Sequence, residues 1–237
     1  MLTSYEPRLA RVAAMIADPV RSRMLSYLLA GHYASAGELA AVGSVSASTT
    51  SGHLAKLEQG GLICVEQRGR HRYFKLADAD VAHALESLAL VAERSGHRRQ
   101  WSSPARQQVR YARRCYGHLA GQLGVALLER LVLNRRIDAD GDDFRVTDEG
   151  ERWLQSIGLE WQRPRASGRV AYACLDWSER RDHLAGSLAA ALLDHFLARQ
   201  WLAPRGGDGA RGGAHYRNRA LRATRKGEME LLPHLLG

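Results

Sequence analysis

The order of local signals between residues 35 and 76 constrains the fold of this chain more than any other feature. Ser35-Ala36-Gly37-Glu38 is a capping box, in which each of the two polar side chains accepts a hydrogen bond from the other residue's backbone amide. It predicts a short helix that ends at Gly43. Ser46 is a favourable N-cap for a second helix, which runs to about Gln59 and stops at a glycine pair. The two helices, joined by the tight turn Gly43-Ser44-Val45, predict a helix-turn-helix.

A β-hairpin with a basic tip is predicted directly after the second helix. Two short apolar or aromatic runs, residues 62–67 and 73–76, have the composition of strands. Between them lies Arg68-Gly69-Arg70-His71-Arg72. Beside a helix-turn-helix, such a hairpin forms a wing whose arginines can reach phosphates or the minor groove.

The second helix and the hairpin tip supply the side chains that we expect to contact DNA. Leu54 and Leu57 are predicted to face inward, which leaves the polar start of the helix exposed. Taken alone, a Ser/Thr-rich helix start indicates a solvated face, and an Arg-rich hairpin indicates a solubility patch; their order along the chain favours DNA binding. Contacts from Ser, Thr and His are adaptable, so they predict no target sequence. The expected contacts are Ser46, Ala47, Ser48, Thr50, Ser51, His53, Lys56, Arg68, Arg70 and Arg72.

Helices are predicted on both sides of this motif. One ends near Ala17, and Asp18-Pro19 then begins another, because an Asp N-cap followed by Pro is a strong helix start. A further helix is predicted from Asp80 to Arg94. The first and last of these helices carry apolar stripes, which we expect to join two copies of the chain: Leu9, Val12 and Ile16, and Val81, Leu85 and Leu88.

As a continuous pattern, residues 5 to 94 resemble the ArsR/SmtB family of small dimeric repressors. The resemblance implies a winged helix-turn-helix homodimer, docked by its first and last helices, that an effector releases from a double-stranded DNA operator. The matching stretches are Asp18-Pro19-Val20-Arg21, Glu38-Leu39-Ala40, residues 45–54, residues 57–63 and residues 68–73.

The chain departs from this family at its familiar metal sites. Metal-sensing members carry Cys near the Glu-Leu-Ala helix, where this chain has Leu39-Ala40-Ala41-Val42. Other members carry a spaced Asp/His/Glu set on the last helix, and here Asp80, His83 and Glu93 do not match that spacing. Both sites are therefore expected to be absent. The extension of about 140 residues resembles longer ArsR-like regulators, whose effectors vary.

The C-terminal half contains a degenerate duplication. His118-Leu119-Ala120-Gly121 recurs at residues 183–186, and residues 144–150 recur in altered form at 220–227. Thr147 and Thr224 are predicted to cap the closing helices. We expect a mainly α, α+β protein with two domains. Residues 1–98 form the winged helix-turn-helix and dimerisation domain, and residues 104–237 form two repeats, at about 104–160 and 170–237, assigned to effector sensing.

Two cysteines in this half are candidates for sensing. Cys115 follows two arginines and precedes His118 by three positions, so on a helix the two would share a face, and the cations would lower the thiol pKa. With Cys174 and His183 they form a candidate site for a soft metal or a thiol switch. The alternative, which we favour from sequence alone, is that the cysteines are small apolar fillers and the histidines are hydrogen-bonded packing residues.

The tryptophans of this half leave two interpretations open. Trp177, with Trp101, Trp153, Trp161 and Trp201, either lines a pocket for an apolar effector or seals the interface between the repeats.

Charge and hydropathy limit the remaining function classes. A formal charge of +9 favours polyanionic partners. No apolar run reaches ~20 residues, and we expect no signal peptide because residues 1–23 mix charged and apolar side chains. Three scattered cysteines are typical of a reducing cytoplasm, where we expect the protein to act. The sequence predicts a dimeric repressor released by a small-molecule effector, without a cofactor. The alternatives are a redox or soft-metal sensor using Cys115 and Cys174, an enzyme using Cys115 and His118, and a non-specific architectural DNA binder.

Overall fold

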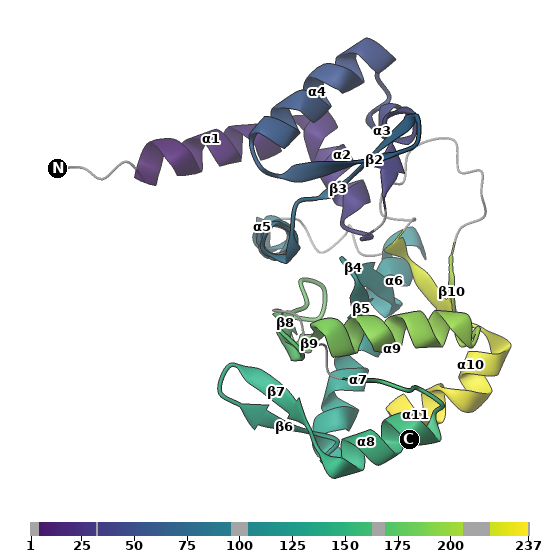
Figure 1. Ribbon diagram of the computed structural model, residues 1–237. Helices are drawn as coiled ribbons and strands as arrows, with labels where there is room; N and C mark the ends of the chain where they lie inside the picture. Colours follow the sequence, from purple (N-terminus) through teal and green to yellow (C-terminus); the bar gives the residue numbers. More distant parts are fainter. Residues whose placement is uncertain (1–4, 32, 96–103, 163–168, 206–218, 237) are drawn as a thin grey trace.

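The computed structural model describes residues 5–31, 33–95, 104–162, 169–205 and 219–236 (Figure 1). Residues 96–103, which include Trp101 and the junction between the two predicted domains, lie outside this description. The N-terminal half contains α1 (Tyr5–Ala17), α2 (Pro19–Leu28), β1 (Ala34–Ser35), α3 (Ala36–Gly43), α4 (Ala47–Gln59), β2 (Ile63–Arg68), β3 (His71–Leu76) and α5 (Ala79–Ser95).

The predicted helix signals of this half are confirmed. Asp18 Oδ1 accepts hydrogen bonds from the amides of Val20 and Arg21, both at 2.9 Å. The Ser35–Glu38 capping box is present, and Ser46 accepts from the Thr49 amide at 3.2 Å. Between α3 and α4 the chain reverses at Ser44, which has a positive φ of 55°. These local contacts set the helix-turn-helix geometry.

The wing is larger than predicted. Strands β2 and β3 pair over six residues each, so Arg68, His71 and Arg72 belong to strands and the turn is reduced to Gly69 and Arg70. Gly69 has a φ of +61°, a conformation that a glycine adopts without strain. The short strand β1, which has no signal of its own in the sequence, adds to β3 and completes the order β1-β3-β2.

A compact apolar core holds the N-terminal elements together. Leu54 and Leu57 face inward as predicted, with exposed fractions of 3% and 0%. They pack with Met24 and Leu28 of α2 and with Leu76 of β3. Because α4 is attached to this core through its apolar face, its opposite face is left for contacts outside the monomer.

The C-terminal half has a separate core. Its elements are α6 (Pro104–Tyr111), β4 (Arg113–Cys115), β5 (His118–Ala120), α7 (Gln122–Leu133), β6 (Ile137–Asp140), β7 (Asp143–Val146), α8 (Asp148–Ser156), β8 (Tyr172–Leu175), β9 (Asp182–Ala185), α9 (Ser187–Ala198), β10 (Leu202–Pro204), β11 (Leu221–Ala223), α10 (Arg225–Glu230) and α11 (Leu232–Leu236). The predicted mixed α+β class is confirmed.

The two halves of the repeat have matching local geometry. Gly121 and Gly186 begin α7 and α9 with φ of 79° and 98°, and a Cβ at either would lie 2.5 Å from a backbone oxygen. Thr147 and Thr224 cap α8 and α10 as predicted, each accepting from a glycine amide at 3.0 Å. The repeats also interlock, since α7 packs on β9 and α9 packs on β5. This arrangement brings β5 and β9 side by side.

Candidate functional site

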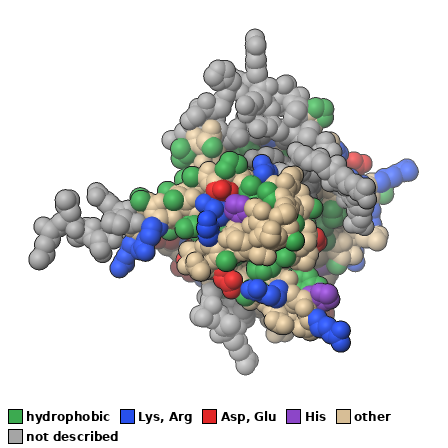
Figure 2. Space-filling view, turned by 90° about the horizontal axis from the view of Figure 1, so that it is seen from above, with side chains coloured by type: hydrophobic (Ala, Val, Ile, Leu, Met, Phe, Trp, Pro, Cys, Tyr) green, Lys and Arg blue, Asp and Glu red, His purple; other side chains and the backbone are tan. Residues whose placement is uncertain are grey.

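The recognition face of α4 is exposed and polar. Ala47, Ser48, Ser51 and Lys56 are all exposed, whereas the Ser46 hydroxyl is used to cap the helix. Figure 2 looks down on the face of the N-terminal half, where Lys and Arg side chains lie both within the face and at its edge. Exposed polar side chains on a helix with cations around them suit a helix in the major groove flanked by phosphate contacts.

Of the expected DNA contacts, Thr50 is wrong because it is buried, and His53 is less exposed than predicted. Thr50 is fully buried, and its Oγ1 donates to the backbone oxygen of Ser46 at 2.9 Å. His53 is only 15% exposed in its side chain, and its Nδ1 lies 3.8 Å from the Asp18 carboxylate at the start of α2. Both residues share the helix face of Leu54 and Leu57, because positions three, four and seven apart lie on one side of a helix.

The predicted contacts also left out several exposed positions on α4, two of which lie in its N-terminal half. Thr49 is exposed beside the predicted contacts. Gly52 is exposed in mid-helix, and a Cβ added there would meet nothing within 4 Å. A glycine in a helix interior costs about 0.5–1 kcal/mol relative to alanine, and no contact within the described monomer requires a glycine here. The sequence signal that could have identified Gly52 was a glycine inside an otherwise regular predicted helix.

The wing arginines are exposed, and two of them are oriented by local partners. Arg68 pairs with Glu66 at 2.8 Å and lies over the Tyr33 ring at 4.3 Å. Arg72 lies 3.5 Å from Glu58 at the end of α4. Arg70 is exposed at the turn itself. The Arg72–Glu58 contact joins the wing to α4, so the wing arginines and the exposed residues of α4 lie on one continuous surface.

A second candidate site lies in the C-terminal half, where two hairpins meet. Cys115 is the cross-strand partner of His118 in β4–β5, and Cys174 is the partner of His183 in β8–β9. All four residues are buried, and one ligand atom from each lies within 4.8 Å of the others. The Nε2 atoms of the two histidines are 3.1 Å apart. Each repeat therefore contributes one cysteine and one histidine to a single cluster.

Two expectations for Cys115 are wrong. It lies on a strand, so it meets His118 across a hairpin rather than along a helix. Its thiol is also not activated by Arg113 and Arg114, since the neighbouring Cys174 thiol and complete burial raise the pKa of Cys115 to about 12. Burial likewise lowers the pKa of His118. Burial therefore disfavours both the thiolate of Cys115 and the charged form of His118.

Asp176 connects this cluster to a buried charge network. Its Oδ2 lies 3.4 Å from Nδ1 of His183, accepts from the Gly121 amide at 2.7 Å and pairs with Arg113 at 2.9 Å. Burial alone would raise the pKa of Asp176, but the charges of Arg113 and His183 hold this pKa well below its usual range. The carboxylate is therefore ionised.

Arg113 extends the network to the N-terminal half. It is fully buried against the Trp177 ring and lies 3.9 Å from Glu86 of α5. Glu86 is 3% exposed and pairs with Arg219 at 2.8 Å. The halves also meet where the Tyr116 amide donates to the Leu29 carbonyl at 2.7 Å. The charge network thus runs from the Cys–His cluster to the helix expected at the dimer interface.

The tryptophans that the structure describes do not line a common pocket. Trp153 and Trp201 belong to the C-terminal core. Trp177 instead borders a cavity of about 260 Å³ lined by α2 and α5, with Glu86 and Arg219 among its lining residues. His83, one of the residues considered for a family metal site, has its Nε2 3.3 Å from the Tyr172 hydroxyl.

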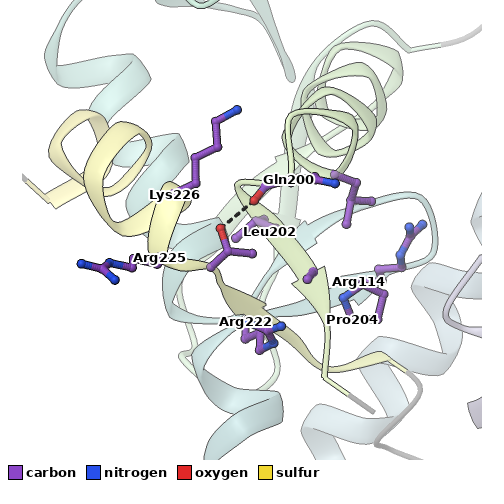
Figure 3. Close-up of a pocket in the computed structure, with 10 residues that line it drawn as sticks. Arg114, Gln200, Leu202, Pro204, Arg222, Arg225 and Lys226 are labelled. Atoms are coloured by element: carbon purple, nitrogen blue, oxygen red, sulfur yellow. Dashed lines mark hydrogen bonds between the residues drawn. The ribbon is translucent and has the colours of Figure 1, made fainter. Parts of the chain in front are cut away.

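A further pocket lies in the C-terminal half and is shown in close-up in Figure 3. It has a volume of about 620 Å³ and is lined by Arg114, Arg222, Arg225 and Lys226, among others (Figure 3). A hydrogen bond from Thr224 to the Gln200 backbone oxygen crosses it at 2.6 Å. The side chains of Arg225 and Lys226 point away from the other labelled residues, so the pocket has no converging set of donors.

None of the helices in the described residues is both long and apolar enough to cross a membrane.

Comparison with known proteins supports the N-terminal assignment and extends it to the whole chain. A helix-turn-helix domain family matches residues 16–66. The uncharacterised HTH-type transcriptional regulator YdfF of Bacillus subtilis is 36% identical over 230 residues, which cover 97% of both chains. The HTH-type transcriptional regulator CmtR of Mycobacterium tuberculosis is 40% identical over 86 residues, 36% of this chain and 72% of CmtR.

A solved structure also matches the N-terminal third. The homodimeric winged helix-turn-helix domain Mb0332 of Mycobacterium bovis, described as a possible ArsR-family regulator, covers 38% of this chain and 82% of its own, with 28% identity and a TM-score of 0.36. The relationship to YdfF includes the C-terminal extension and establishes the family over nearly the full length. The chain belongs to the HTH-type transcriptional regulators, with a sequence pattern that resembles the ArsR/SmtB type and a long C-terminal extension that it shares with YdfF.

Proposed function

We propose that this regulator is a homodimeric repressor that leaves its DNA operator when the C-terminal half receives a signal. The observation that carries this proposal is the burial of Glu86 of α5 against Arg113 and Arg219 of the C-terminal half. Removing one member of a buried ion pair costs about 3–5 kcal/mol, so any change at Arg113 also acts on α5. This helix is where the family resemblance places the dimer interface.

Exposed apolar side chains support a second copy of the chain as the partner. In Figure 1, α1 extends away from the rest of the molecule. Leu9 and Val12 on α1 are 58% and 38% exposed, and Leu88 and Val91 on α5 are 48% and 54% exposed. Leu85 is buried in the monomer core, so the predicted stripe on α5 is shifted toward Leu88 and Val91. We infer a dimer through these faces, with recognition helices one DNA turn apart, ~34–36 Å.

In this proposal DNA is bound through the exposed residues of α4 and the three wing arginines, in the cytoplasm. The site acts by binding and release, and the effector shifts the equilibrium between two dimer geometries. A coupling of about 1–3 kcal/mol between effector and DNA is typical of such regulators.

The test uses the full-length chain and the DNA next to its own coding region. Light scattering should give a dimer at micromolar concentration, and Glu86→Gln should change the affinity for this DNA several-fold. Asp80→Asn is the matched control, because Asp80 is exposed on the same helix and should leave affinity unchanged. A monomer, or a Glu86→Gln protein with wild-type affinity and dimerisation, would overturn the proposal.

A further inference from the structure

We infer that Cys115, His118, Cys174 and His183 bind one divalent cation of the zinc class, Zn²⁺ or Cd²⁺, in a tetrahedral site between the two repeats. The cation is then the signal of the C-terminal half, and this second statement rests on the proposed function. The site differs in position from both metal sites considered from the family resemblance, which involve the Glu-Leu-Ala helix and the last helix of the N-terminal half.

The distances in the cluster are close to those of a filled site. A tetrahedral ion with ordinary Zn–N and Zn–S bonds separates two imidazole nitrogens by about 3.3 Å and two thiolate sulfurs by about 3.8 Å. The two Nε2 atoms are 3.1 Å apart, and all four ligand atoms lie within 4.8 Å of one another. Shifts of a few tenths of an ångström to about one ångström would complete the coordination.

The donor set also suits the charge of the ion. Binding is written M²⁺ + 2 Cys–SH + 2 His → M(Cys–S)₂(His)₂ + 2 H⁺, so two thiolates neutralise the cation and the buried site keeps a net charge of zero. Two sulfurs and two nitrogens in a tetrahedron favour zinc-class ions over Mg²⁺ or Ca²⁺, which prefer oxygen ligands.

The cross-strand geometry explains how such short strands can hold four ligands. Each hairpin holds its cysteine directly opposite its histidine, and the interlocked helices α7 and α9 press the hairpins together. Gly124 of α7 allows this close packing, since a Cβ there would lie 2.4 Å from the Leu119 backbone oxygen and 3.4 Å from His183 Cβ. If the two cysteines were only small apolar fillers, nothing would require the polar atoms of all four residues to converge.

Asp176 supports the proposed site through the second ring nitrogen of His183. With Nε2 of His183 turned to His118, Nδ1 is buried, has no hydrogen bond of good geometry and lies 3.4 Å from the Asp176 carboxylate. Metal-bound histidines ordinarily donate their second N–H to a carboxylate, which orients the ring. Coordination would draw His183 into this arrangement. Because Asp176 also holds Arg113, the movement reaches Glu86 of α5.

The first experiment measures metal binding without DNA. The reduced, chelator-stripped full-length protein is titrated with Co²⁺, whose tetrahedral thiolate complexes absorb strongly in the visible and near ultraviolet, and Zn²⁺ is then added. We expect one Co²⁺ per chain with thiolate-to-cobalt absorption, full displacement by Zn²⁺ or Cd²⁺, and no competition from Mg²⁺. Absence of this absorption in the wild-type protein would overturn the site, whatever the variants do.

Variants then locate the ligands. Cys115→Ser and Cys174→Ser should each lose most of the thiolate absorption, and Asp176→Asn should bind ~10–100-fold more weakly. Cys64→Ser is the matched control, because Cys64 is a free cysteine of the N-terminal half. Wild-type absorption in Cys115→Ser, or its loss in Cys64→Ser, would contradict the assignment.

A second experiment separates the site from the proposed function. Affinity for DNA is measured with and without Zn²⁺ in wild type and Cys115→Ser. A Zn²⁺-dependent change of about 5–150-fold in wild type only supports both proposals. If Co²⁺ binds but DNA affinity is unchanged, the metal site stands and its role as the signal fails. If no metal binds while the dimer still binds its DNA, the metal site fails and the repressor proposal stands.

Discussion

His118 and His183 occupy equivalent positions in the two repeats, and their Nε2 atoms face each other at 3.1 Å. Both begin a His-Leu-Ala-Gly sequence whose glycine starts a helix at positive φ. The duplication thus does more than double a structural unit, because it brings two copies of the same donor pair to one buried point. A site of this kind is created by the interface between the repeats and by neither repeat alone.

The wing is expected to bind the DNA backbone. Replacing Arg70 and Arg72 with alanine should weaken binding to all sequences alike and flatten its salt dependence, since fewer counterions are released. Fluorescence anisotropy at several salt concentrations measures both effects. Arg145→Ala is the control, because it removes one exposed arginine of the C-terminal half, distant in sequence from the wing. Normal affinity in the double variant would show that the hairpin does not contact DNA.

Two adjacent residues of α4 should separate stability from recognition. Ser51 is exposed, so Ser51→Ala should reduce affinity for the cognate site selectively, by up to about tenfold. Thr50 is buried, so Thr50→Val should leave recognition unchanged and alter the free energy of unfolding by about 1 kcal/mol or less. Denaturant melts and competition binding distinguish the two. The reverse pattern would mean that α4 is rotated relative to DNA.

Gly52 gives an independent test of the recognition face. Gly52→Ala should stabilise the protein by about 0.5–1 kcal/mol, because a Cβ at this position meets nothing in the monomer. The same variant should bind DNA more weakly if the duplex approaches the helix closely there. A stabilised protein with unchanged DNA affinity would remove Gly52 from the interface.

The buried network should make Glu86 important for stability. Glu86→Gln removes the carboxylate that pairs with Arg219 and one of the two that lie near Arg113, and it should cost about 3–5 kcal/mol in the free energy of unfolding. Urea denaturation followed by tryptophan fluorescence measures this cost. A change below about 1 kcal/mol would show that the two halves are not held together through this residue.

The N-terminal half was predictable because its signals are local. Asp18-Pro19, Ser35 with Glu38, and Ser46 each begin a helix through contacts two or three residues away. The wing strands and inward leucines followed from composition and spacing. The orientation of Thr50 and His53 did not, because which polar residues face the core depends on how far the apolar face of α4 extends around the helix.

For the Cys–His cluster, the sequence predicted which residues belong together but not how they are arranged. Cys115, His118, Cys174 and His183 were named from the repeat, but a three-residue strand such as β4 has too short a pattern to distinguish it from a helix. The high pKa of Cys115 also depends on burial by the second repeat, which is distant in sequence. Asp176, Arg113 and Glu86 form a network across 90 residues, and the sequence carries no local signal for it.

The central claim is that this chain recognises one operator, and competition binding tests it most directly. A labelled duplex from beside the coding region is bound by the full-length protein at physiological salt and challenged with unlabelled cognate or random DNA. The account predicts that cognate DNA competes at least ~10³-fold better than random DNA. Equal competition by the two, for every fragment of the region next to the coding sequence, would contradict it and identify a non-specific architectural DNA binder instead.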